Sequence, residues 1–266
     1  MRGVFGASRR LTAAVAAGLA AVLAACAYEG PANSQPRSTL IIGIDVSGSF
    51  RASGDYHDAL AFAARYIHGH LNGLGGLDVP RALFVGSIGG NEEGMPQAFH
   101  PIHDFQGKSV EQIQLDLEEW FPPNNRITDF NAFFSRAAEL VQRQNLTLAP
   151  ITIVVLTDGV PDLSSGSGGA RRVANDDPAR YTELDVSGLE YLARNVTIRV
   201  LYPEPPVAVA WERHLPRNRV RVWTVDNVVM RGWHAHWVPD AEPEAQEAFW
   251  TWVRDNVDFR VRRRLF

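Results

Sequence analysis

The chain has 266 residues, of which 45% are hydrophobic and 21% are charged, and it contains one cysteine. A single cysteine excludes a disulfide within the chain, so the fold must depend on its hydrophobic core. The formal net charge of −4 argues against a nucleic-acid partner, because such proteins carry a basic surface.

The first 26 residues predict an export signal and not a part of the fold. A start with three arginines is followed by an apolar run over residues 11–25. This run is too short to span a bilayer and is typical of a signal peptide, which we expect at residues 1–25. Residues 23–26, Leu-Ala-Ala-Cys, resemble a bacterial lipobox, in which the cysteine becomes the acylated N-terminus. We therefore expect a lipid on Cys26; an ordinary signal peptide is the alternative.

Cleavage before Cys26 would leave a short tether and an acidic mature chain. Residues 26–38 comprise the lipidated cysteine and a polar segment with proline, asparagine and serine, which is typical of a flexible tether. Loss of the three leader arginines moves the formal charge from −4 to −7. Ala27 follows the cysteine, where an aspartate would hold an enteric lipoprotein at the inner membrane. We therefore expect a lipid-anchored protein of the bacterial cell envelope, at the outer membrane.

A buried strand that ends in small oxygen-bearing residues begins the folded part. Residues 40–44 are apolar apart from one glycine, which suits a strand buried on both faces. Asp45, Ser47 and Ser49 follow at intervals of two. Their side chains would lie at the carboxyl edge of a parallel sheet, where open α/β sheets bind their ligands. One carboxylate and two hydroxyls indicate a site for a hard cation, magnesium or manganese.

The rest of the chain alternates between helical and strand patterns. Apolar residues at helical spacing predict helices near residues 60–71, 109–120, 130–141, 189–193, 207–215 and 245–253. Apolar runs predict strands at 81–88, 97–103, 151–156, 196–202 and 220–225, with 97–103 returning antiparallel to the strand before it. This alternation predicts a doubly wound α/β fold, in which helices cover both faces of a mostly parallel sheet.

Two further oxygen-bearing residues complete a pattern. Asp158 ends the strand at 151–156, in Leu-Thr-Asp-Gly, and Thr128 lies just before a helix, in Ile-Thr-Asp-Phe. Together with the Asp-x-Ser-x-Ser motif at 45–49, this set resembles the von Willebrand factor A-type (VWA) domain and its metal-ion-dependent adhesion site. The resemblance covers roughly residues 38–258, and we expect the domain at 39–258, followed by a basic tail at 259–266.

The resemblance implies a Rossmann-like fold with one antiparallel edge strand and a bound Mg²⁺ or Mn²⁺. The implied ligands are those of the pattern: Asp45, Ser47, Ser49, Thr128 and Asp158. It also implies a protein partner whose Asp or Glu completes the coordination. Hydroxyl ligands donate little negative charge, so a bound cation retains affinity for such a carboxylate. The run of serine and glycine at 164–169 directly follows the Asp158 strand, and we expect this insertion to lie beside the site.

Three alternatives remain open at this point. Asp45, or any other residue of the set, could be an ordinary helix cap. Asp45 could be the nucleophile of a metal-dependent hydrolase or phosphotransferase, although the chain lacks a P-loop, a GxSxG and an HExxH motif. The domain could also be an envelope scaffold with an idle metal site. We expect no enzyme activity, and we expect His234 and His236 to belong to an aromatic surface loop and not to a zinc site.

Overall fold

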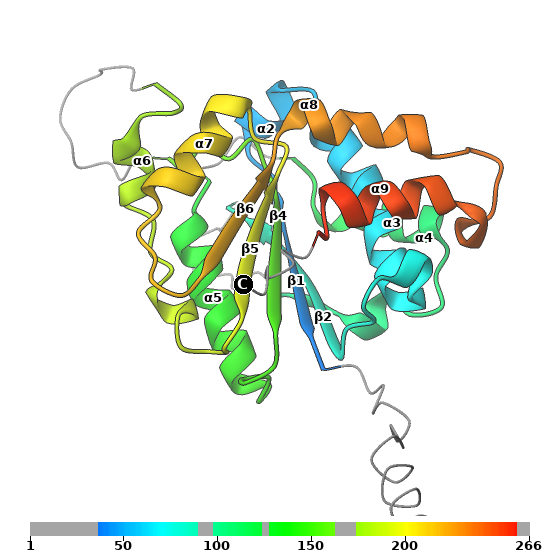
Figure 1. Ribbon diagram of the computed structural model, residues 1–266, viewed down its shortest axis with the longest axis horizontal. Coiled ribbons are helices and arrows are strands. Elements are labelled where there is room, and N and C mark those ends of the chain that lie inside the picture. Colours follow the sequence, from blue (N-terminus) through cyan, green and yellow to red (C-terminus); the bar gives the residue numbers. More distant parts are fainter. Residues whose placement is uncertain (1–36, 90–97, 124–127, 163–173, 260–266) are drawn as a thin grey trace, which may run out of the picture. The chain divides into compact units, whose positions relative to one another are not determined.

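The chain divides into two units, residues 1–35 and residues 36–266. The computed structural model describes residues 37–89, 98–123, 128–162 and 174–259, all within the second unit (Figure 1). The predicted signal peptide, Cys26, most of the tether, the run at 164–169 and the arginines of the basic tail lie outside the described residues.

Six strands form a single sheet in the described part of the chain, in the order β3-β2-β1-β4-β5-β6. The strands are β1 (Thr39–Asp45), β2 (Ala82–Ile88), β3 (His100–Pro101), β4 (Ile151–Leu156), β5 (Val196–Leu201) and β6 (Arg221–Val225). All neighbours are parallel except β3, which pairs antiparallel with β2 at the edge. The predicted fold class is confirmed: an α/β fold with a mostly parallel sheet and one antiparallel edge strand, as in a VWA domain.

Helices cover both faces of the sheet (Figure 1). The α-helices are α2 (Gly48–Ala52), α3 (Tyr56–Asn72), α4 (Val110–Trp120), α5 (Phe130–Arg143), α6 (Pro178–Thr182), α7 (Pro205–His214), α8 (Asn227–Met230) and α9 (Glu247–Asn256). Short 3-10 helices are η1 (Leu74–Gly76), η2 (Ile102–Asp104), η3 (Ser187–Leu189), η4 (Arg231–His236) and η5 (Pro243–Ala245).

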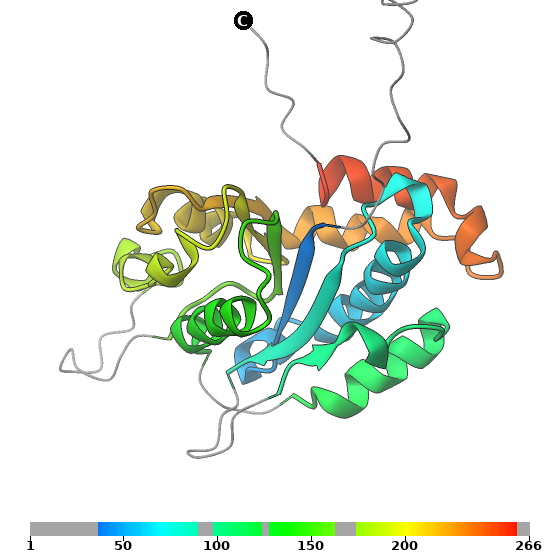
Figure 2. The same cartoon turned by 90° about the horizontal axis from the view of Figure 1, so that it is seen from below.

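Two hydrophobic cores result, one on each face of the sheet. Helices α3, α4 and α9 pack on the face that carries Ile42 and Ile44 of β1. Helices α5, α6 and α7 pack on the opposite face, which carries Ile41. Figure 2 shows the sheet between these two groups of helices. Every residue of β1 is buried, because this central strand contacts a helical layer on each side.

Local sequence signals account for several helix ends. Ser109 and Gln112 form the predicted capping box at the start of α4. Helix α3 ends at Gly73, whose φ of 63° is the left-handed conformation that glycine adopts with little strain. The Asp129 carboxylate accepts the N–H of Ala132 and caps α5. Asp129 is therefore a helix cap.

Three expectations about local structure are wrong or only partly right. The helix predicted at 189–193 is a 3-10 turn, η3, followed by irregular chain. Leu189, Leu192 and Ala193 are buried there, so their spacing reports packing and not a helix. The strand predicted at 97–103 is reduced to His100–Pro101. The region of His234 is the 3-10 helix η4, in which Trp233 is part of the core.

No helix in the described ranges is both long enough and apolar enough to cross a membrane.

Candidate metal centre at the carboxyl edge of the sheet

Parallel pairing brings the two aspartates of the sequence pattern to one edge. Strands β1 and β4 are neighbours, and Ile44 lies opposite Leu156. Asp45 and Asp158 therefore follow these positions at the same edge of the sheet. Gly159 comes next with a φ of 76°, and a Cβ there would lie 2.9 Å from the side chain of Val207. A glycine at this position permits the sharp turn that directs the chain away from Asp158.

Asp45 is fully buried, and both of its carboxylate oxygens accept hydrogen bonds. The N–H of Ser47 donates to Oδ1 over 2.9 Å, and the Thr157 hydroxyl donates to Oδ2 over 2.6 Å. Burial, and then the nearby charge of Asp158, raises the pKa of Asp45 from 3.8 to about 7, although these hydrogen bonds act in the opposite direction. A cation at this edge would favour the ionised carboxylate.

Ser47 and Ser49 lie at the start of α2. The Ser47 hydroxyl caps this helix by accepting the N–H of Phe50 over 3.3 Å. Its Oγ lies 3.1 Å from Oγ of Ser49. Ser47 is therefore a helix cap through this one contact. The hydroxyl oxygens of Ser47 and Ser49 can in addition act as neutral metal ligands.

Asp158 joins the same cluster. Burial raises its pKa, a hydrogen bond with Ser49 and another from the N–H of Val160 lower it, and the charges of Asp162 and Glu204 raise it further. The Val160 N–H lies 3.1 Å from Oδ1 of Asp158. A buried and a half-buried carboxylate of like charge, with hydroxyls between them, form a site that disfavours full ionisation without a cation.

Thr128 is buried beside this edge, with 3% of its surface exposed. Its backbone N–H donates to Oδ2 of Asp162 over 2.6 Å. Because Asp162 also acts electrostatically on Asp158, the connection from Thr128 to the cluster passes through Asp162. The structure thus brings Asp45, Ser47, Ser49 and Asp158 together and places Thr128 next to them.

Two contributors, Thr157 and Asp162, were missed by the sequence analysis. Thr157 immediately precedes Asp158, and its hydroxyl bridges Asp45 and the N–H of Gly159. Its position in Leu-Thr-Asp-Gly could have suggested this role, because it directly adjoins the second motif. Asp162 had no comparable signal, since its contact with Thr128 spans 34 positions of the chain.

The donor set fits a hard cation. Among the described residues, no group of three or more His, Cys, Asp and Glu could hold a metal ion. A cation at this edge would therefore need the serine and threonine hydroxyls in addition to the two carboxylates. Such an all-oxygen set suits Mg²⁺ or Mn²⁺ better than zinc.

His234 of η4 contacts a carboxylate outside the candidate metal centre. His234 Nε2 makes a close contact with a carboxylate oxygen of Asp58, and the Trp233 indole N–H donates to the same carboxylate over 3.2 Å. Tyr202 also donates to Asp58, over 2.7 Å. These contacts tie η4 to the start of α3.

Comparison with solved structures finds proteins with little sequence similarity, among them one VWA domain. Proximal thread matrix protein 1 from the mussel byssus is 13% identical, with a TM-score of 0.42 over 74% of this chain and 46% of its own. The SpRpn10 VWA domain is 14% identical, with a TM-score of 0.38 over 71% of this chain and 88% of its own. The pilus adhesin SpaC from Lactobacillus rhamnosus GG is 12% identical, with a TM-score of 0.40 over 83% of this chain and 30% of its own.

The chain thus spans less than half the length of the byssus protein and of the pilus adhesin. No protein-family model and no curated protein matches the sequence.

Proposed function

We propose that this chain is a non-enzymatic binding protein that captures a protein partner through a divalent cation, Mg²⁺ or Mn²⁺. The observation that carries the proposal is the convergence of a buried carboxylate, a half-buried carboxylate and two serine hydroxyls at the carboxyl edge of the sheet. Asp45, Ser47, Ser49, Thr128 and Asp158 would hold the cation. When bound, the cation would supply a positive charge at this edge that attracts an acidic side chain.

Neighbouring residues hold the proposed metal ligands in fixed orientations. The Thr157 hydroxyl and the Ser47 N–H hold both oxygens of Asp45, so its carboxylate cannot rotate freely. Asp162 holds the backbone of Thr128, which begins the turn into α5. A set of oxygens held in place before binding loses less conformational entropy when it takes up a ligand.

The partner's contribution follows from charge. Three of the five proposed ligands are neutral hydroxyls, which donate little negative charge, so a bound cation would retain affinity for a further carboxylate. An Asp or Glu of the partner would give a charge-assisted contact in a partly desolvated site. Loss of such a buried contact typically costs roughly 2–5 kcal/mol of binding free energy.

The burial of Asp45 weighs against the enzymatic alternative. A nucleophilic carboxylate must reach the atom that it attacks, but Asp45 has no exposed surface and both of its oxygens accept hydrogen bonds. The same arrangement suits a residue that tunes and orients a cation site.

We also propose that Cys26 anchors the chain by a lipid to the bacterial cell envelope, at the outer membrane. The support is the lipobox-like sequence and the apolar run before it. A tether between lipid and domain would leave the carboxyl edge free to meet a partner in the envelope.

Affinity capture from envelope extract tests the proposed function. Wild type and Asp45→Ala would be compared in magnesium and in chelator, with Asp255→Asn as a matched control on the exposed surface of α9. We expect a partner that wild type and the control retain only with magnesium, and that Asp45→Ala loses. Identical capture with magnesium and with chelator would leave the cation at most a structural role and would favour the scaffold alternative.

A further inference from the structure

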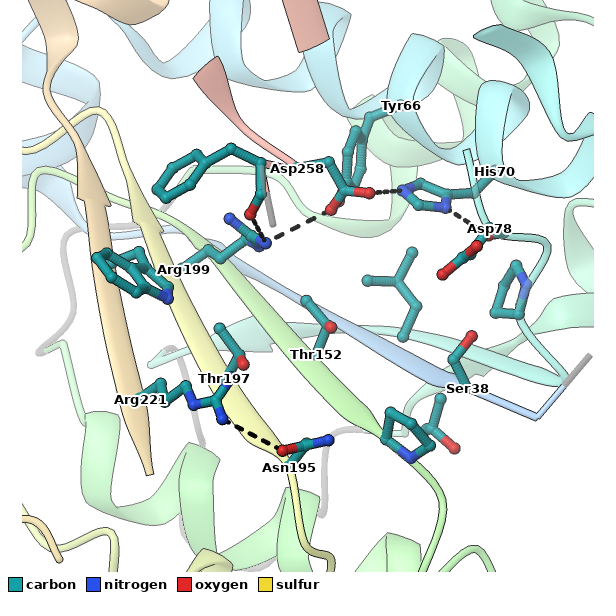
Figure 3. Close-up of a pocket in the computed structure, with 16 residues that line it drawn as sticks. Ser38, Tyr66, His70, Asp78, Thr152, Asn195, Thr197, Arg199, Arg221 and Asp258 are labelled. Carbon is teal, nitrogen blue, oxygen red and sulfur yellow. Dashed lines mark hydrogen bonds and ion pairs between the residues drawn. The ribbon is translucent and has the colours of Figure 1, made fainter. Parts of the chain in front are cut away.

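A second polar pocket lies at the opposite edge of the sheet, near the amino ends of β1, β4, β5 and β6 (Figure 3). Its volume is about 400 Å³, which is within the range of small-molecule sites. The end of α3 and the segment after α9 form its other walls. None of the proposed metal ligands lines this pocket.

Three buried polar atoms of the described residues that line this pocket have no hydrogen-bond partner: Oγ1 of Thr39, Nε2 of His70 and Nε of Arg199. The last two belong to titratable side chains. His70 is 5% exposed and Arg199 is 7% exposed. The carboxylate of Asp258 lies between them, with Oδ2 at 3.9 Å from His70 Nε2 and Oδ1 at 3.8 Å from Arg199 Nε (Figure 3). Both distances are too long for a hydrogen bond. Buried polar groups are normally paired, so these unpartnered atoms point to a ligand or water in the pocket.

The chemistry of His70 identifies what is missing. Its Nδ1 lies 2.8 Å from the backbone oxygen of Asp78, and because a carbonyl only accepts, Nδ1 carries the proton. Burial lowers the pKa of His70, which favours the neutral ring, although Asp258 acts in the opposite direction. Nε2 is then an acceptor that faces another acceptor, Asp258 Oδ2. A ligand nitrogen that donates two hydrogen bonds, about 2.8 Å from each of these two acceptors, would satisfy both.

The other wall of the pocket is basic and needs an acceptor. The terminal nitrogens of Arg199 donate to the backbone oxygens of Val257 and Phe259, so Nε is the guanidinium nitrogen without a hydrogen bond. Arg221 lines the same wall from β6. Asp258 and Asp78 thus lie toward α3, while the two arginines lie on β5 and β6 (Figure 3).

We propose that this pocket binds a small zwitterion of the α-amino acid class. The ammonium group would lie between His70 Nε2 and Asp258 Oδ2, and the carboxylate would accept from Arg199 Nε and approach Arg221. A simple anion would leave the two facing acceptors unsatisfied, and a simple cation would leave Arg199 without an acceptor. This inference does not depend on the proposed metal centre.

Calorimetry and saturation-transfer NMR on the full-length protein test the proposal, with L-alanine as the probe. Acetate and methylamine serve as probes that carry only one of the two charges. We expect L-alanine to bind with a Kd near or below ~1 mM and each one-ended probe to bind at least about tenfold more weakly.

The decisive variant is Asp258→Asn. Its amide can donate to His70 Nε2 and so replace the ligand's ammonium group, while the side chain keeps its size. We expect thermal stability to be retained and L-alanine affinity to fall at least about tenfold. Asp255→Asn, an exposed change three residues earlier on α9, is the matched control and should bind as wild type does.

Three outcomes would overturn the proposal. Wild type that does not bind L-alanine would mean that the pocket holds only water. Binding unchanged in Asp258→Asn would locate the amino acid elsewhere on the protein. Acetate or methylamine that binds as well as L-alanine would exclude recognition of a zwitterion.

Discussion

Replacing Asp45 with asparagine should stabilise the metal-free protein at pH 8. Burial and the charge of Asp158 raise the pKa of Asp45 from 3.8 to about 7. Between these two values the folded protein holds a proton that the unfolded chain has released, so stability falls as pH rises through this window. At 1.36 kcal/mol for each pH unit, the ionised carboxylate destabilises the folded state by about 4 kcal/mol at pH 8.

The variant loses part of this gain. Asparagine retains an oxygen that can accept the Ser47 N–H, but its amide cannot accept the hydrogen bond that Thr157 donates to Asp45. That loss costs about 1–2 kcal/mol, which leaves a net stabilisation of about 2–3 kcal/mol at pH 8. At pH 5 only about 1.2 pH units of the window have been passed, a penalty of about 1.6 kcal/mol, which the lost hydrogen bond offsets, so the variant should have no advantage there.

Urea unfolding of both full-length proteins at pH 5 and pH 8, in chelator and in magnesium, measures this effect. In chelator we expect the higher midpoint for Asp45→Asn at pH 8 only. Magnesium should raise the midpoint of wild type at pH 8 and leave the variant unchanged, because binding to the folded state alone stabilises it. A variant that is less stable than wild type in chelator at both pH values would refute the argument that Asp45 is strained by burial and by Asp158.

Three further predictions concern the anchor, the site and the insertion. Cys26→Ser should release or mislocalise the protein, and membrane fractionation with the mass of the mature N-terminus would check this; an unchanged result in both would exclude the lipid anchor. Asp158→Ala should abolish magnesium binding in calorimetry while circular dichroism shows a retained fold, and Thr128→Ala should make partner capture weaker and insensitive to magnesium; wild-type affinity in either variant would remove that residue from the proposed set. Shortening the run at 164–169 should change which partner is captured while calorimetry shows unchanged magnesium affinity, and loss of both would instead mean that the insertion supports the site itself.

The order of strands and helices followed from the sequence because each element is encoded locally. All seven residues of β1 are buried, and residues 40–44 within it are a short apolar run bounded by polar residues, which suits a strand covered on both faces. The capping box of α4 joins residues three positions apart, and the glycine that ends α3 bonds to a residue four positions before it. Both contacts are local, so they can be recognised without tertiary structure. The Asp-x-Ser-x-Ser motif was recognisable for the same reason.

Only the tertiary structure determined which polar groups meet. Neighbouring strands β1 and β4 bring Thr157 to Asp45 across 112 positions of the chain. Asp162 reaches Thr128 from a loop that carries no periodic pattern. The apolar residues at 189–193 predicted a helix, but burial there comes from packing of a turn, and spacing alone cannot distinguish the two. The pocket of His70, Arg199 and Asp258 likewise joins three separate segments, because burial and charge pairing depend on distances in space that local sequence does not specify.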